Sequence, residues 1–77
     1  MISKARKILY KKGVFSGRDV GRVRKVLGWS QQRIADVIGV HQSQISRWER
    51  EVSPVPHWVR ISLLAGLHED EMKGKKR

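Results

Sequence analysis

Residues 27–51 read LGWSQQRIADVIGVHQSQISRWERE, and the residue spacing within this stretch decides the fold. Ser30 is a candidate N-cap, because its hydroxyl can accept a hydrogen bond from a first-turn N–H group. Apolar residues then recur at helical spacing, and a glycine ends the run: Ile34, Ala35, Ile38 and Gly39. The pattern predicts a short helix over residues 31–38.

A second short helix is predicted over residues 42–50, after the tripeptide Gly39-Val40-His41. Its apolar face consists of Ile45 and Trp48. Two short helices joined by a three-residue turn with a glycine are the signature of a helix-turn-helix. The second helix would then present polar side chains outward from a rigid base: Gln42, Ser43, Ser46 and Arg47.

The flanking sequence adds further helices. Ser16 and Asp19 form a capping box at the start of a helix over residues 17–27, which Gly28 ends. A fourth helix is expected after Pro54 and Pro56, with Gly66 at its end. Its predicted buried stripe is Trp58, Ile61, Leu64 and Ala65, and the core is expected to comprise Val20, Val23, Leu27, Ile34, Ala35, Ile38, Val40, Ile45, Trp48, Trp58, Ile61 and Leu64.

The two ends of the chain are rich in charge. Residues 3–12 could form one more helix, but like charges recur at i,i+4 spacing, so we expect a partly ordered arm. No segment alternates with period two, so the fold class is all-α, a small bundle of four to five helices. The predicted organisation is a basic arm or short helix over 1–15, a helix-turn-helix domain over 16–67 and a charged tail over 68–77, disordered from residue 73.

Composition narrows the function. The 77 residues include 17 Lys or Arg against 7 Asp or Glu, a formal charge of +10, which favours polyanionic partners. Cysteine is absent, and His41, His57 and His68 are too far apart for a zinc set, so we expect no metal site. We expect no enzyme, cofactor or small-molecule ligand, because no paired carboxylates or nucleophile–base set is visible. No apolar run approaches the roughly 20 residues of a membrane span.

The positive charge is concentrated near the N-terminus. Residues 1–13 carry +5 and residues 14–29 carry +3, so +8 of the total +10 precedes residue 30. The helix-turn-helix, residues 30–50, carries only +1. We therefore expect nonspecific electrostatic binding and base recognition to be carried by different segments. The N-terminal lysines would contact the DNA backbone.

The stretch quoted first resembles the XRE/Cro/C1-type helix-turn-helix, the DNA-binding domain of phage repressors and related regulators. The matching residues include Ser30, Gln31, Ala35, Gly39, Gln42, Ser43, Ile45, Trp48 and Glu49, and the likeness extends over about residues 20–67. The resemblance implies a lambda-repressor-like fold. His41 departs from the family pattern, which has Ser, Thr or Asp as the N-cap of the second helix.

The resemblance also implies residue roles. Gln42, Ser43 and Arg47, with Ser46 beside them, would read base edges, and Arg24 would form a structural bridge to Glu49. Gln31 matches a phosphate contact. Other candidates for the DNA backbone are Arg33, Gln44, Arg50, Arg18, Arg22, Lys25 and His57.

The expected function is therefore sequence-specific regulation of transcription, most simply repression, by a cytoplasmic, nucleoid-associated protein. The expected partner is double-stranded DNA with a palindromic operator, bound by a homodimer. Two other functions stay open. One is an antitoxin-type autoregulator that also binds a protein partner, and the other is a basic RNA-binding or nucleoid protein without sequence specificity.

Overall fold

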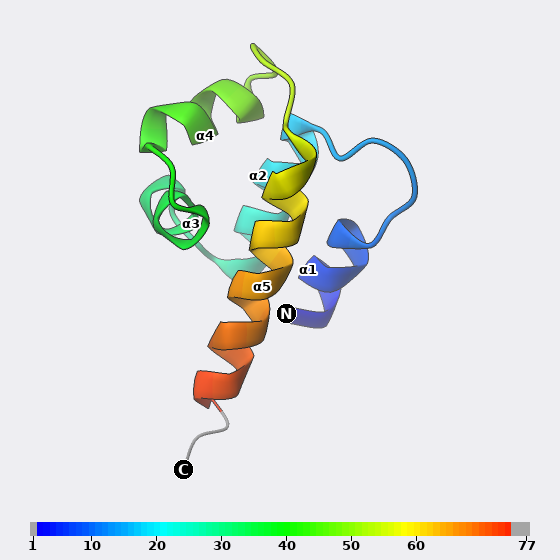
Figure 1. The fold of residues 1–77 in the computed structure, drawn as a ribbon, viewed down its shortest axis with the longest axis vertical. Coiled ribbons are helices and arrows are strands. Elements are labelled where there is room, and N and C mark those ends of the chain that lie inside the picture. The colour runs from blue at the N-terminus through cyan, green and yellow to red at the C-terminus, as the bar shows by residue number, and fades with distance from the viewer. Residues whose placement is uncertain (1, 75–77) are drawn as a thin grey trace.

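The computed structural model describes residues 2–74, with side chains over residues 3–69, and these residues form five helices without any strand (Figure 1). The all-α class is thus confirmed. The helices are α1 (Ile2–Leu9), α2 (Gly17–Leu27), α3 (Gln31–Ile38), α4 (Gln42–Glu49) and α5 (His57–Gly74).

The predicted caps explain where α2 and α3 begin. The backbone N–H of Ser16 donates to the Asp19 carboxylate at 2.9 Å, which is the reciprocal bond of a capping box. At the start of α3, Ser30 Oγ accepts from the Arg33 N–H at 3.0 Å. Both helices have the predicted bounds, whereas α4 ends at Glu49, one residue before the predicted end at Arg50.

A single apolar core draws on every helix. Its buried members are Ala5, Leu9, Phe15, Val20, Val23, Ile34, Ala35, Ile45, Trp48, Val59, Leu63 and Leu67. Four other residues predicted for the core, Leu27, Ile38, Val40 and Leu64, pack against it while partly buried. The core therefore holds α3 and α4 in place from inside the bundle.

The N-terminal segment differs from the expected partly ordered arm. Residues 2–9 form α1, which packs against α2 and α5, and its Ala5 and Leu9 side chains are fully buried. Ala5 and Leu9 are four residues apart, so one face of α1 is apolar while the basic residues remain on the others. Burial of this face outweighs the repulsion among exposed cations, which solvent screens.

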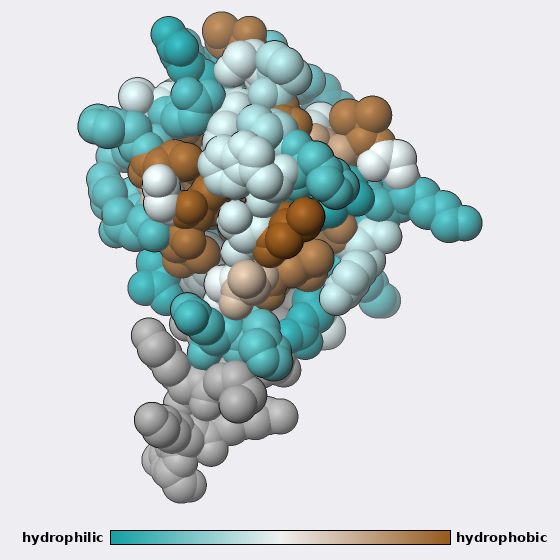
Figure 2. Space-filling model, viewed as in Figure 1, coloured by the Kyte–Doolittle hydropathy of each residue, from teal (hydrophilic) through white to brown (hydrophobic). Residues whose placement is uncertain are grey.

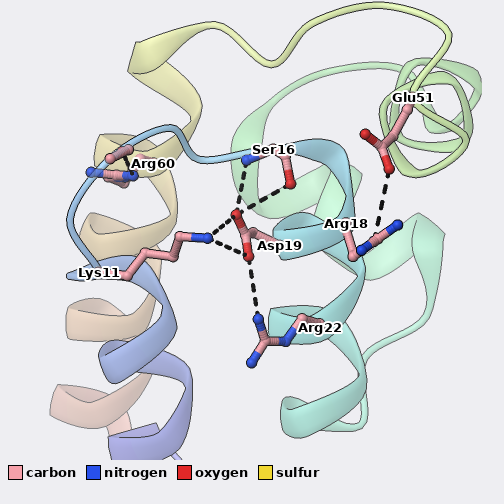
Figure 3. Close-up of polar contacts among 8 residues, drawn as sticks. Lys11, Ser16, Arg18, Asp19, Arg22, Glu51 and Arg60 are labelled. Atoms are coloured by element: carbon pink, nitrogen blue, oxygen red, sulfur yellow. Dashed lines mark hydrogen bonds and ion pairs between the residues drawn. The ribbon is translucent and has the colours of Figure 1, made fainter.

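A buried carboxylate joins the α1–α2 loop to α2. Asp19 is 2% exposed, and the Lys11 Nζ lies 3.0 Å from its Oδ2, while Arg22 Nη1 lies 3.5 Å from its Oδ1 (Figure 3). Burial raises the pKa of the Asp19 carboxyl, but the hydrogen bonds from Ser16 and Lys11 and the charge of Lys11 lower it below its ordinary value of 3.8. Asp19 is therefore a buried, ionised carboxylate that stabilises the fold by binding Lys11 and Ser16.

The buried face of α5 also differs from the prediction. Val59, Leu63 and Leu67 are fully buried, whereas Trp58 is 46% exposed and Ile61 is 56% exposed. Ala65 is exposed as well. Apolar residues surround α5 on most sides of its first three turns, so periodicity alone does not single out one face. The predicted stripe was wrong for Trp58, Ile61 and Ala65.

Gly66 has a packing role instead of ending α5, which continues to Gly74. A Cβ atom added at Gly66 would lie 2.3 Å from Val37 Cγ1, closer than such atoms approach. The glycine therefore lets α5 approach α3 closely. The disordered tail predicted from residue 73 falls partly within α5, and its residues 75–77 lie outside the described residues.

The burial of α1 makes it part of the stable fold. Leu9→Ala should lower the free energy of unfolding by about 2–5 kcal/mol, the range for a fully buried leucine. Urea denaturation followed by circular dichroism measures this loss. Tyr10→Ala, at a 67% exposed neighbour, is the control and should cost much less. Equal small losses in both variants would contradict the packing of α1 into the core.

Candidate nucleic-acid interface

The turn between α3 and α4 sets the position of α4. Gly39 ends α3 in the left-handed conformation, with φ 87°, and Val40 packs against the core from the turn. Ile34 of α3 and Ile45 of α4 are fully buried behind this turn. The two helices are therefore fixed relative to one another by apolar contacts.

The buried side of α4 determines which residues face outward. Ile45 and Trp48 point into the core, so Gln42, Ser43 and Arg47 are exposed on the opposite side. Ser46 and Gln44 are half-buried. His41 is the N-cap residue but makes no side-chain cap hydrogen bond. The first turn of α4 therefore lacks the side-chain cap that Ser30 gives to α3.

A shallow groove runs along the α3 side of α4. It is lined by Gln31, Gln32, Val40, His41, Gln42, Ser43 and Ser46. Hydrogen-bonding amides and hydroxyls dominate this lining, and no Lys, Arg, Asp or Glu belongs to it. The groove thus gathers three of the four residues predicted to read bases, together with Gln31.

Arg47, the fourth predicted base-reading residue, lies on the other side of α4. It lines a second groove with Gln44, Trp48 and Trp58, toward the start of α5. Trp48 and Trp58 meet edge to face, with ring centroids 6.3 Å apart. Arg47 and Gln44 therefore border the α5 edge of α4, and Gln42 and Ser46 border its α3 edge.

A bidentate ion pair joins α2 to the end of α4. Arg24 Nε lies 2.7 Å from Glu49 Oε2, and Arg24 Nη2 lies 3.1 Å from Glu49 Oε1. The Gln31 amide at the start of α3 also donates to Glu49 Oε1, at 3.1 Å, and Arg24 Nη1 donates to the Trp29 carbonyl at 3.2 Å. One carboxylate thus receives donors from two other helices.

The protonation of this cluster follows from its contacts. Burial raises the pKa of the Glu49 carboxyl, but hydrogen bonds from Arg24 and Gln31 and the charges of Arg24 and Lys25 bring it below its ordinary value of 4.5. The hydrogen bond to Glu49 raises the pKa of Arg24 above its ordinary value. Both groups are therefore charged at neutral pH.

The candidates for the DNA backbone fall into two groups. Gln31, Arg33, Gln44 and Arg50 lie on α3, on α4 or at its end, and the exposed His57 begins α5. Arg33 stacks on the Trp29 ring at 5.1 Å, so its guanidinium has a fixed platform at the start of α3. Arg18, Arg22 and Lys25 instead lie on the exposed side of α2.

Sequence reasoning missed three features of this surface. It did not place Gln32 in the groove beside Gln42, nor the bond between Gln31 and Glu49, nor the exposed contact of Trp58 with Trp48. The position of Gln32, directly after Gln31 at the start of α3, was the one signal that it could lie near Gln42. Helical spacing does not show that Gln31 donates to Glu49 whereas Gln32 donates to Asp36.

Comparison with known families agrees with this geometry. Residues 20–56 match the family HTH_3, described as Helix-turn-helix, whose members are of the Cro/C1 type. These residues span α2, α3, α4 and the loop that leads to α5. Comparisons with curated proteins and with solved structures found no significant match. The fold and the match define a lambda-repressor-like helix-turn-helix protein.

Within that class, the chain is an XRE/Cro/C1-type protein, a DNA-binding regulator of transcription. Among the helices of the described residues, none is both long and apolar enough to cross a bilayer.

The ion pair predicts how stability depends on pH. The folded pKa of Glu49 lies below its ordinary value of 4.5, which applies to the unfolded chain, so ionised Glu49 stabilises the fold above that pH. This contribution is lost as the pH falls through the folded pKa. Glu49→Gln should lower the free energy of unfolding by about 1–3 kcal/mol at pH 7 and reduce its loss in acid, measured by urea denaturation between pH 3 and 7.

Glu51→Gln provides the matched control. Glu51 lies 3.9 Å from Arg18, but both side chains are mostly exposed, at 52% and 80%, so water screens their attraction. This variant should unfold like the parent at every pH. A Glu49→Gln variant that kept the full stability of the parent at pH 7 would contradict a stabilising role for the bridge.

Proposed function

We propose that this regulator binds duplex DNA in a sequence-specific manner, with α4 in the major groove. The carrying observation is the outward face of α4, which is polar and rests on a rigid base. Its buried side is held by Ile45 and Trp48, and its end by the bridge to Arg24. Such a helix can enter a groove without losing order, so little binding energy is spent on fixing it.

The base-reading residues proposed are Gln42, Ser43, Ser46 and Arg47. A glutamine side chain both donates and accepts, which suits N6 and N7 of adenine, and arginine suits O6 and N7 of guanine. Serine accepts either pattern. Since Gln42 and Arg47 border opposite edges of α4, we expect them to read different base pairs.

Phosphate contacts would flank this readout on both sides. We assign these contacts to residues at the start of α3, in and just after α4, and at the start of α5: Gln31, Arg33, Gln44, Arg50 and His57. The start of α3 also directs first-turn N–H groups outward, a favourable position for a phosphate. Because the Gln31 amide donates to Glu49, a phosphate at this point would connect with the bridge that fixes α4.

We further propose that two copies bind a palindromic operator and repress by occupying a promoter. The exposed side of α5 supports a homodimer, because Trp58 and Ile61 leave large apolar surfaces in solvent beside the reading helix. Figure 2 shows hydrophobic side chains gathered on the face that α5 presents. Contact between two α5 helices would place two α4 helices for neighbouring major grooves, about one helical turn or roughly 34 Å apart.

The first test concerns base reading. Gln42→Ala should weaken binding to the preferred site by about 1–3 kcal/mol and flatten the preference at one base pair. The preferred site is first selected from random duplexes, and fluorescence anisotropy then measures affinity. Tyr10→Ala is the control, since its 67% exposed side chain lies just after α1 and lines neither groove beside α4. An unchanged preference in Gln42→Ala would contradict reading by α4.

The second test concerns the homodimer. Ile61→Lys places a charge on the exposed apolar side of α5 and should shift the protein toward the monomer in sedimentation velocity. Affinity for a palindrome should fall, while affinity for a half-site should stay the same. Val14→Lys makes the same change at an 82% exposed valine in the α1–α2 loop and should alter neither. A dimer that survives Ile61→Lys would place the interface elsewhere.

A further inference from the structure

A groove between α1 and α2 lies apart from the surface proposed to read DNA. Three residues of each helix line it: Lys4, Lys7 and Ile8 from α1, and Arg22, Lys25 and Val26 from α2. In Figure 1, α1 and α4 lie on opposite sides of the bundle, and α1 packs mainly against α2 and α5. A molecule bound over α1 would therefore leave the outward face of α4 free.

The two helices contribute the same pattern to this groove. Each has two cations and one aliphatic residue at positions i, i+3 and i+4, which lie on one side of a helix. Ile8 and Val26 are partly buried and pack against the core, while the four cations are exposed. The groove thus has an apolar floor between two basic rims, and no acidic residue lines it.

Most of these cations form no ion pair within the part of the chain whose side chains the structure describes, residues 3–69. Arg22 lies 3.5 Å from Asp19, but Lys4, Lys7 and Lys25 form no ion pair with any residue whose side chain the structure describes. Lys25 acts on Glu49 only at longer range, by its charge. Like charges this close repel one another and disfavour the folded state. An acidic partner would remove that repulsion, whereas the fold itself gains little from these lysines.

We infer that this groove binds an acidic amphipathic helix of a partner protein. Leucine-type side chains of the helix would cover Ile8 and Val26, and its Asp and Glu residues would pair with the rims, the usual mode of a helix in a groove. DNA phosphates could meet the lysines, but DNA offers no side chain for the apolar floor. The eight residues of α1 span about 12 Å, which accommodates two to three turns of a partner helix.

Such a site gives the regulator a second function beyond DNA binding. It would hold a partner protein on the α1 side of the bundle while α4 contacts the operator. Arg22 and Lys25 were candidates for the DNA backbone from the sequence, but no residue of the groove belongs to the base and phosphate contacts proposed around α4. The inference therefore does not require the proposed DNA site. Failure of one is therefore distinguishable from failure of the other.

The test titrates the full, ¹⁵N-labelled chain with a synthetic 16-residue peptide that has leucines along one helical face and glutamates on either side. Amide signals of residues 4–8 and 22–26 should shift, and those of α4 should not. A second peptide with serine in place of each leucine should bind at least about tenfold more weakly, because the floor loses its apolar contact. Equal binding of the two peptides would overturn the inference.

Charge reversal tests the rims. Lys7→Glu should weaken the leucine peptide about tenfold, since one attraction is replaced by a repulsion. Lys12→Glu makes the same change at an exposed lysine outside the groove and should alter affinity less than twofold. Circular dichroism of both variants checks the fold. Gln42→Ala should bind the peptide like the parent, even where it loses operator preference.

Two further titrations identify a different occupant. Duplex DNA and vesicles of phosphatidylglycerol are added in place of the peptide. If either shifts the amides of residues 4–8 and 22–26 while the leucine peptide does not, the groove is a phosphate-binding surface and the inference is wrong. Binding by the peptide that is weakened by Lys7→Glu and unaffected by Lys12→Glu supports it.

Discussion

The arrangement of the helix-turn-helix depends on one largely buried ion pair, between Arg24 of α2 and Glu49 at the end of α4. A helix of eight residues such as α4 is marginal in water, so tertiary contacts must hold it. Ile45 and Trp48 anchor its underside through apolar contacts, which are not directional. The two parallel bonds from Arg24, at 2.7 and 3.1 Å, fix the position of its C-terminal end. Because Gln31 donates to the same carboxylate, the start of α3 depends on that pair as well.

Much of this fold could be predicted from local chemistry. Ser16 and Ser30 begin helices, Gly28 and Gly39 end them, and the bounds of α2 and α3 follow from these four residues alone. The α5 face could not be predicted, because Trp58, Val59, Ile61, Leu63 and Leu64 place apolar side chains on most sides of its first turns. The packing of α1 and α3 against α5 selects Val59 and Leu63 for burial. Gly66 likewise has meaning only through Val37, a residue 29 positions earlier in the chain.

The candidate site shows the same division between local and long-range information. The helical spacing predicted which residues of α4 face outward, since Ile45 and Trp48 mark its buried side. It could not show that Arg47 and Gln42 border different grooves, which depends on how α5 and α3 flank α4. For α1, the like charges at i,i+4 spacing predicted a partly ordered arm. That prediction was wrong because exposed charges interact weakly in water, whereas a buried leucine such as Leu9 contributes several times more.

The placement of charge across the bundle decides what α1 can do for DNA binding. The groove on the α3 side of α4 contains no Lys or Arg, and α1 lies on the opposite side of a bundle whose middle dimension is 26 Å. The Debye length at physiological ionic strength is about 8 Å. The lysines of α1 are therefore largely screened from a duplex held by α4 in the proposed manner. Under that proposal, groups closer to α4 such as Arg33 and Arg50 hold the phosphates, which leaves the charge of α1 available to a different partner.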